Sequence, residues 1–491
     1  MVTPLIGGHR QWFCFGILAV LFACGAPLPI AAPVDGGDWP MWGGAPDRNM
    51  VSPEKNLATV FGGTKNENIK WTADLGTQTY GNPVISDGRV YIGTNNGHPR
   101  NPAIKGDRGV LMCFSTSDGS FLWQAVHEKL PTGDAEDWEE IGICSTPCVV
   151  DDRVYYVNNR AELVAYDAEG FADGENDGPF GDEEFSSPGD ADILWVLDMR
   201  GELGVTPYQA SASSPLVVDG VVFVVTGHGM DEHLGKVKNP TAPSFLAVDA
   251  AKGEVLWEDH SPGDRIFEGQ WGSPAYAVVE GQPQVAFPGG DGWLYAFEPK
   301  SGKLLWKFNC KAHEKTRANG KPETKDYLVA HPVYAGFTVM IALGASPESG
   351  DDYGCLWAID ARKRGDITKT AELWRLQRKE FGRSVSGVAV DAGLVYAVEM
   401  GGLVSCIELA TGVRVWRHDF FSAIWGTPLV ADGKVYLRNE DGEVIVFAAG
   451  REKKILATNG LPGLSHGTVT AARGTLYLAG ESQLYAIALP D

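Results

Sequence analysis

One acidic stretch of the sequence carries carboxylates with the spacing of calcium ligands. In residues 169–192, Asp173, Glu175 and Asp177 alternate along the chain, a glycine follows, and Glu184 comes later. Calcium-binding loops use oxygen ligands at their first, third, fifth and twelfth positions, with glycine at the sixth for a sharp turn. These four acidic residues therefore predict a Ca2+ site. A solvated acidic loop without a metal is the alternative, because Glu replaces the usual Asp or Asn at the third position.

The elements that must position this loop are short strands, because the chain repeats a hairpin that ends in tryptophan. Residues 245–257, FLAVDAAKGEVLW, combine an apolar strand, a turn at Lys252-Gly253 and a second strand. Further copies lie at residues 113–123, 165–195, 296–306, 358–374 and 406–416. Repetition of this kind is the signature of a repeat fold.

A second hairpin alternates with the first. It consists of an apolar run, a turn similar to Asp-Gly and another apolar run, and Asp-Gly between alternating apolar residues is the strongest local hairpin signal. Eight copies occur, at residues 82–92, 146–157, 214–225, 273–287, 331–343, 386–398, 427–437 and 468–479. The two hairpins together give four strands per repeat.

The last strand of each repeat indicates how the chain closes. These strands end on Trp71, Trp123, Trp195, Trp257, Trp306, Trp374 and Trp416, with Leu456 in the matching place of the seventh repeat. The final repeat lacks its last strand, and residues 69–72 supply it from the other end of the chain, which leaves no open sheet edge. The sequence predicts an all-β protein, an eight-bladed β-propeller of four-stranded blades over residues 69–491. Seven blades is the alternative if one degraded copy is miscounted.

A small polar residue begins each inner strand and is expected to face the propeller axis. Six of the eight are Ser or Thr, in the set Asn82, Thr146, Ser214, Ser273, His331, Ser386, Thr427 and Thr468. Crowding and turn hydrogen bonds at the axis favour such residues.

Larger side chains stand just ahead of these strands and are candidates for cofactor binding in the axial funnel. They are Gln270, Trp271, Arg383, Trp425 and His466. A guanidinium pairs with carboxylates, and an indole stacks on a flat ring. The alternative is that these residues only line the funnel. No acidic residue stands clearly among them as a base, so the catalytic residues of an enzyme are unknown.

The pattern Ala-x-Asp-x-x-x-Gly-x-x-x-Trp, complete at residues 247–257 and nearly so at 296–306 and 406–416, resembles the repeat of pyrroloquinoline quinone (PQQ) enzymes. The resemblance extends from about residue 69 to residue 489. It implies one of two settings. Quinoprotein alcohol dehydrogenases hold PQQ and calcium at the propeller axis. Non-enzymatic propellers include BamB, the lipoprotein of the outer-membrane β-barrel assembly machinery.

The cysteines favour the non-enzymatic setting. The dehydrogenases often carry adjacent cysteines beside the cofactor, whereas the nearest pair here, Cys144 and Cys148, is separated by about 13 Å at strand rise, too far for a disulfide. Cys113 and Cys406 occupy the alanine position of the repeat, which predicts small buried side chains. Disulfide pairing stays open for the six cysteines after residue 24: Cys113, Cys144, Cys148, Cys310, Cys355 and Cys406.

The N-terminal segment predicts export. Residues 12–23 form an uncharged apolar run that is too short to span a bilayer and suits a secretory signal. We expect a signal peptide or lipoprotein leader over residues 1–32 and an extended lead-in over residues 33–68. Processing either attaches lipid at Cys24 or cleaves among small residues near Ala31. The mature chain is expected in the periplasm or cell envelope without a transmembrane span.

The net charge of the chain argues against a nucleic-acid partner. The net charge is -22, from 41 basic and 63 acidic residues, and an acidic surface repels nucleic acid. We expect a monomeric binding or interaction scaffold with a protein, peptide or glycan partner. The alternative function is a PQQ-dependent dehydrogenase that uses PQQ and Ca2+ at the axis.

Overall fold

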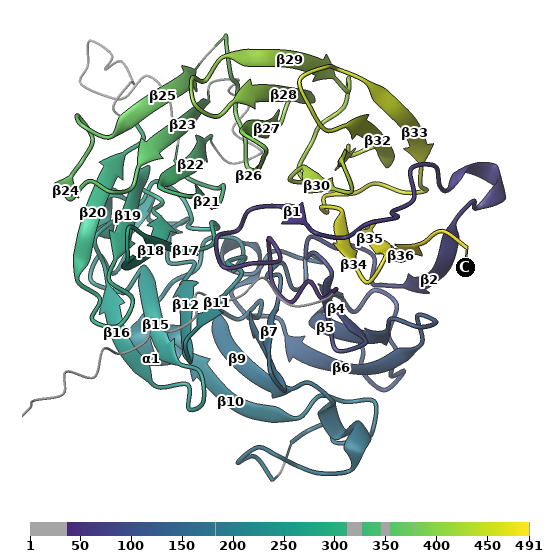
Figure 1. Ribbon diagram of the computed structural model, residues 1–491. Coiled ribbons are helices and arrows are strands. Elements are labelled where there is room, and N and C mark those ends of the chain that lie inside the picture. Colours follow the sequence, from purple (N-terminus) through teal and green to yellow (C-terminus); the bar gives the residue numbers. More distant parts are fainter. Residues whose placement is uncertain (1–36, 182, 312–326, 345–353, 378, 491) are drawn as a thin grey trace, which may run out of the picture. The chain divides into compact units, whose positions relative to one another are not determined.

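The computed structural model describes residues 37–181, 183–311, 327–344, 354–377 and 379–490, and these residues form eight antiparallel sheets arranged in a ring (Figure 1). Each sheet is one blade, and successive blades follow one another along the chain. The prediction of an eight-bladed β-propeller is confirmed, and the alternative of seven blades is wrong.

The blades have four strands each, ordered from the axis outward. Blades 1 and 2 contain β3 (Val84–Ser86), β4 (Arg89–Asn95), β5 (Arg108–Ser115) and β6 (Phe121–Glu128), then β7 (Cys148–Val150), β8 (Arg153–Val157), β9 (Glu162–Asp167) and β10 (Ile193–Asp198). Blades 3 and 4 contain β11 (Leu216–Val218), β12 (Val221–Val225), β15 (Phe245–Asp249) and β16 (Val255–Asp259), then β17 (Ala275–Val279), β18 (Gln282–Pro288), β19 (Trp293–Phe297) and β20 (Leu304–Asn309).

The second half of the ring repeats this order. Blades 5 and 6 contain β21 (Val333–Ala335), β22 (Thr338–Leu343), β23 (Cys355–Asp360) and β25 (Glu372–Gln377), then β26 (Val388–Asp391), β27 (Leu394–Glu399), β28 (Leu403–Glu408) and β29 (Arg414–Asp419). Blades 7 and 8 contain β30 (Leu429–Ala431), β31 (Lys434–Arg438), β32 (Glu443–Ala448) and β33 (Ile455–Gly460), then β34 (Thr470–Ala472), β35 (Thr475–Ala479), β36 (Gln483–Ile487) and β2 (Ile69–Asp74).

Other elements lie outside this pattern: β1 (Val51–Ser52), β13 (Met230–Asp231), β14 (Lys236–Val237), β24 (Gly365–Asp366) and the helix α1 (Met199–Leu203). The ring closes as predicted, because β2 pairs antiparallel with β36 and Trp71 lies opposite Ala486.

In six of the eight blades, a tryptophan of the outer strand donates its indole N–H to the next blade. Trp195 of blade 2 packs on the turn of blade 3, where a Cβ added to Gly253 would lie 2.7 Å from the indole ring. The Trp195 indole N–H donates to the Ala250 carbonyl oxygen of the same turn at 3.0 Å. Only glycine leaves room for the ring, at a backbone φ of 74° that also favours glycine. The spacing of Gly and Trp in the repeat thus encodes contacts between blades.

Blade 7 departs from the predicted pattern. Its β-ladder pairs Val446 with Ala457, so Ala457 and not Leu456 takes the tryptophan position. The prediction was one residue out, because the apolar pair Ile455-Leu456 gives no marker of register where the tryptophan is missing. The lead-in packs here instead: Ala58 is fully buried, and its carbonyl oxygen accepts from the Tyr436 hydroxyl at 3.2 Å.

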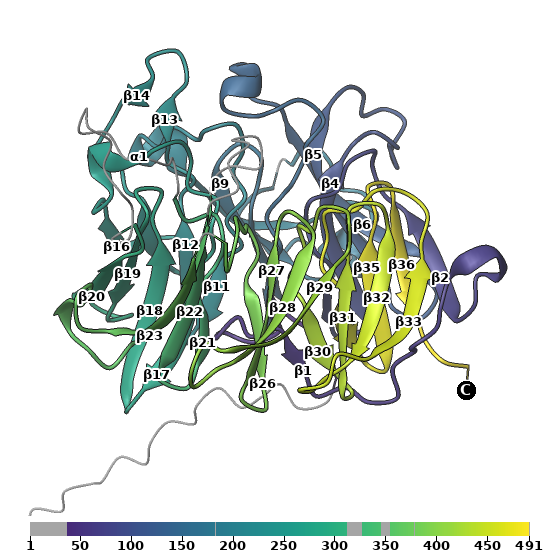
Figure 2. The ribbon, with the colours of Figure 1, turned by 90° about the horizontal axis from the view of Figure 1, so that it is seen from above.

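The N-terminal segment, residues 39–52, crosses one end of the ring and bonds to the inner strands. In Figure 2, β1 lies at the end of the ring opposite β13 and β14. Hydrogen bonds join Trp39 to Ile85 (2.8 and 2.9 Å), Pro40 to Val149 (2.7 Å), Pro46 to Tyr276 (2.8 Å), Asp47 to Tyr334 (3.0 Å), Asn49 to Val390 (2.8 and 2.9 Å), Met50 to Val430 (2.9 Å) and Ser52 to Ala471 (3.4 Å). These partners belong to every blade except blade 3.

Arg48 supplies the contact to blade 3. Its fully buried guanidinium donates to the carbonyl oxygens of Ser214 and Pro215, both at 3.0 Å, and to those of Pro274 at 2.8 Å and Trp42 at 2.7 Å. Burial lowers the pKa of Arg48 to about 10, so the side chain stays charged at neutral pH. The N-terminal segment therefore contacts all eight blades.

We predict that Arg48→Met lowers the free energy of unfolding by about 3 kcal/mol, because buried carbonyl oxygens lose their donors. Guanidinium chloride titration followed by circular dichroism measures this change. Arg451→Met is the control, since Arg451 is exposed and its ion pair with Glu408 contributes little. Equal unfolding midpoints for the two variants would contradict the role of Arg48.

Candidate functional site

A cavity of about 460 Å3 lies on the propeller axis. All eight blades contribute to its lining, each through the loop that precedes or begins its inner strand. The described lining residues are Trp42, Gln78, Tyr80, Asn82, Trp138, Glu139, Ile141, Cys144, Thr146, Gln209, Ala210, Ala212, Ser214, Trp271, Ser273, Val329, His331, Val385, Trp425, His466 and Thr468. A volume of this size is typical of a small-molecule site.

The polar residues that begin the inner strands form a belt of hydrogen bonds around the cavity. A backbone N–H of one blade donates to the side-chain oxygen at the matching position of the next blade. The bonds run from Asn82 to Thr146 (3.2 Å), Thr146 to Ser214 (3.0 Å), Ser214 to Ser273 (2.9 Å), Gly387 to Thr427 (3.2 Å), Thr427 to Thr468 (2.9 Å) and Thr468 to Asn82 (2.7 Å). The hydroxyls thus bond between blades, rather than within turns as expected.

The belt is interrupted at blade 5, where His331 and Trp42 form part of the cavity floor. The Trp42 indole N–H points at the His331 ring, 3.1 Å from Nδ1, and the two rings meet edge to face. Burial lowers the pKa of His331 to about 3, so the imidazole is neutral. Because Trp42 belongs to the N-terminal segment, the same segment that ties the blades together also closes one end of the cavity.

The structure brings three of the five predicted axial residues to the cavity: Trp271, Trp425 and His466. Gln270 points away; it is fully buried and donates to the His228 carbonyl oxygen at 2.8 Å, because adjacent residues of an extended chain face opposite sides. Arg383 is half-buried and packs beside Gly344, outside the described lining.

His466 belongs to an aromatic cluster in the cavity wall. Its ring stacks on Tyr80 with centroids 4.5 Å apart and meets the edge of Trp425 at 4.8 Å. Burial lowers the pKa of His466, although Glu440 lies 3.6 Å from its Nε2. The ring is therefore neutral at physiological pH.

The sequence interpretation missed Trp42 and Trp138 as lining residues. Trp42 lies in the lead-in, where no repeat marks its position, and Trp138 lies in a loop between blades 1 and 2. Its neighbour Glu139 is the one charged residue, other than histidine, among the described residues of the lining. No lysine or arginine belongs to that described set.

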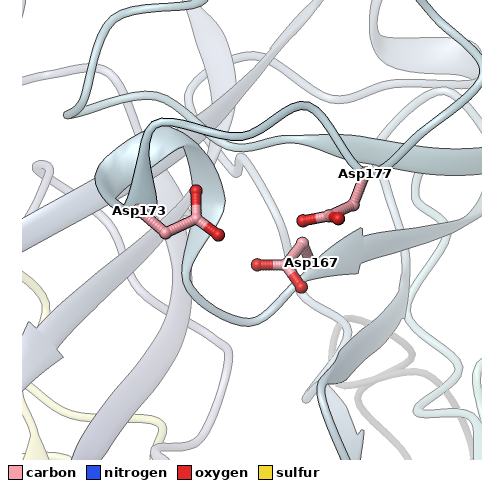
Figure 3. A group of neighbouring side chains, drawn as sticks. All are labelled: Asp167, Asp173 and Asp177. Atoms are coloured by element: carbon pink, nitrogen blue, oxygen red, sulfur yellow. The ribbon is translucent and has the colours of Figure 1, made fainter.

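The predicted calcium loop lies elsewhere, beside blades 1 and 2. Figure 3 shows that Asp173 and Asp177 turn toward Asp167, the last residue of β9, and one carboxylate oxygen of each lies within 4.8 Å of the others. Glu175 and Glu184 are exposed and do not belong to this group. The loop thus brings together two of the four predicted ligands and adds one that the spacing did not reveal. Calcium binding stays a prediction.

Asp167 is the buried member of the group. Burial, with the nearby charges of Asp177 and Asp173, raises its pKa to about 6. When no cation is bound, the charged side chain therefore costs stability, because burial removes the carboxylate from water.

The family is decided by comparison with known proteins. The family model described as "Outer membrane protein assembly factor BamB" matches residues 186–347 and 354–490, more than half of the chain. The chain belongs to the BamB family.

Individual relatives of this BamB-family propeller include both outer membrane assembly factors and a quinone-dependent alcohol dehydrogenase. The outer membrane protein assembly factor BamB of Shewanella oneidensis is 22% identical over 352 residues, which cover 70% of this chain and 67% of that protein. The dehydrogenase subunit of the quinone-dependent alcohol dehydrogenase of Gluconacetobacter polyoxogenes is 30% identical over 129 residues, 25% of this chain. That match spans only 14% of the dehydrogenase.

Solved structures share the fold. The crystal structure of BamB from Moraxella catarrhalis has a TM-score of 0.54 and 14% sequence identity, and the match covers 85% of this chain and 98% of that chain. The computationally designed Ika8 protein also has a TM-score of 0.54, with 11% identity, 86% of this chain and 100% of that chain. Among the described residues of this BamB-family chain, no helix has the length and apolar character needed to cross a bilayer.

PQQ does not fit the described lining of the axial cavity. The quinone carries several carboxylates that need a cation, and its calcium ion needs a cluster of oxygen ligands. The described lining contains no lysine or arginine, and the only group of metal-ligating side chains among the described residues is the Asp167 group beside blades 1 and 2. The ligand set that the dehydrogenase resemblance implies is therefore missing from this part of the chain.

Asp167→Asn is predicted to stabilise the protein in a pH-dependent way. Because the pKa of Asp167 is higher in the folded state, its charge destabilises the fold increasingly as pH rises from 4 to 6. In EDTA at pH 7.5 the variant should gain about 1–2 kcal/mol of unfolding free energy, and the gain should shrink toward pH 4. Denaturant titrations at the two pH values measure it.

Glu175→Gln is the matched control, because Glu175 lies in the same loop but is exposed and outside the group. A gain for Asp167→Asn that is equal at both pH values would contradict the assigned cause. The predicted calcium site requires in addition that Ca2+ raise the melting temperature of the native chain more than that of Asp167→Asn.

Proposed function

We propose that this BamB-family propeller is an exported, non-enzymatic binding scaffold of the cell envelope, which holds its partner at the axial cavity. The observation that carries the proposal is the character of the described cavity lining. It combines four tryptophans with neutral polar side chains and offers no cationic residue. Such a lining suits recognition through ring surfaces and hydrogen bonds, and its described part lacks the cationic groups that would hold a carboxylated redox cofactor.

The geometry supports binding from one side. Trp42 and the N-terminal segment lie at one end of the axis, so a partner reaches the cavity from the end where the loops ahead of the inner strands gather. Loops held by a rigid scaffold are the usual place for binding residues. In Figure 2 the extra hairpin β13–β14 rises at the end of the ring opposite β1 and enlarges that face.

The relatives support the setting in the cell envelope. Relatives that match over half or more of their own length are outer membrane assembly factors, whereas the dehydrogenase match spans a small part of its protein. The apolar run of residues 12–23 suits an export signal, although it lies outside the described residues. A protein, peptide or glycan partner in the envelope is therefore part of the proposal, and attachment through a lipid at Cys24 is one way to hold the chain there.

The proposal predicts that purified protein does not bind PQQ stoichiometrically. The protein is incubated with PQQ and Ca2+, and excess quinone is then removed. The absorbance spectrum of the protein should show well below one equivalent of bound quinone. Alcohol-dependent dye reduction should stay at the level of the buffer. Stoichiometric PQQ together with turnover of an alcohol would overturn the scaffold function and establish a dehydrogenase.

A further inference from the structure

We propose that the axial cavity binds the end of a neutral glycan chain. This inference rests on the scaffold function proposed above and names the class of ligand for the same site. It is carried by the hydrogen-bonding state of the belt hydroxyls, the ring surfaces around them, the charge of the lining and the closed end of the cavity.

Four belt hydroxyls of the lining have a hydrogen to donate. Thr146, Ser214, Ser273 and Thr468 are each at least 93% buried. Each accepts a backbone N–H from the neighbouring blade, and Thr146 accepts in addition from the Asn82 side-chain amide at 3.3 Å. A Ser or Thr hydroxyl also carries one donor, and no described residue accepts the hydrogen of any of the four. The cavity therefore presents a set of buried O–H donors that need acceptor oxygens on a ligand.

The aromatic residues around these donors offer apolar ring surface. The indole N–H groups of Trp42 and Trp271 are already bonded, to His331 and to the carbonyl oxygens of Tyr208 and Ala210. Their remaining contribution to a ligand is contact with the ring. A sugar ring matches both features, because its C–H groups form an apolar face and its hydroxyl and ether oxygens accept hydrogen bonds.

The charge of the lining selects a neutral ligand. Anionic groups such as uronic acids and phosphates meet no cation among the described lining residues and are repelled by a chain of net charge -22. Glu139 is exposed at the cavity, whereas the buried part of the lining is uncharged. The binding of a cationic peptide would depend on the charge of Glu139, whereas the binding of a neutral sugar would not.

The closed end of the cavity selects the end of a chain. The N-terminal segment bonds to the inner strands at one end of the axis, and its Trp42 lines the cavity floor beside His331. We infer that a polymer does not pass through this end. A cavity of about 460 Å3 has room for a small ligand only. The terminal sugar units of an oligosaccharide satisfy this restriction.

Isothermal titration calorimetry of the purified chain with maltotriose, cellotriose and chitotriose tests the inference. At least one of them should bind with a stoichiometry of one. Thr468→Val should weaken that binding by about tenfold, because one buried hydrogen bond to the ligand is lost.

Thr427→Val is the matched control. Thr427 belongs to the same belt and accepts the same kind of N–H, but it does not line the cavity. Both variants should therefore lower the melting temperature by similar amounts, while only Thr468→Val weakens the binding of the sugar. Equal weakening by the two variants would overturn the assignment of a ligand contact to the Thr468 hydroxyl.

Two further variants separate the ligand classes. Trp138→Ala should weaken sugar binding about tenfold, because the contact with the indole ring is lost. Trp293→Ala should leave sugar binding unchanged, because Trp293 lies outside the lining. Glu139→Gln should leave sugar affinity within about twofold, since the contact is neutral. Failure of all three sugars to bind at millimolar concentration would overturn the glycan inference. Binding of lysine-rich peptides that depends on Glu139 would in that case leave the scaffold function standing. PQQ turnover would overturn both.

Discussion

The unpaired inner edge of each blade is the constraint on which this structure depends. A four-stranded sheet in a ring leaves the backbone groups of its first strand facing the axis, where eight such edges converge. Buried backbone groups without partners are costly, so they must be satisfied. The protein does this twice, with a belt of side-chain oxygens near the cavity and with the N-terminal segment at the other end of the inner strands.

These two devices also decide what the axis is able to bind. The belt turns small hydroxyls toward the cavity, and the N-terminal segment places Trp42 across one end of it. The cavity that results is closed at one end, aromatic, and neutral apart from Glu139 among its described residues. The proposed scaffold function follows from this lining, because a site without cationic groups favours recognition of neutral partners over redox cofactor chemistry.

Much of the fold was predictable because each structural requirement leaves a residue in every repeat. Gly253 and Trp257 mark turn and register, and residues 69–72 reveal the closure. Where the marker is lost, the register was missed by one residue, at Ala457. The site was less predictable. Gln270 and Trp271 are neighbours that face opposite ways, and Asp167 joins the acidic group through a strand end that ligand spacing does not show. Arg48 lies in a segment without a repeat, so no pattern revealed that it bonds to blades 3 and 4.

The N-terminal segment ties the blades into one cooperative unit. Native-state hydrogen exchange on the full chain tests this at the amides of Val149, Tyr276, Tyr334 and Val430, which donate to that segment from four different blades. We expect these amides to exchange with one common opening free energy, equal to that of global unfolding. Distinct opening free energies for separate blades would contradict it.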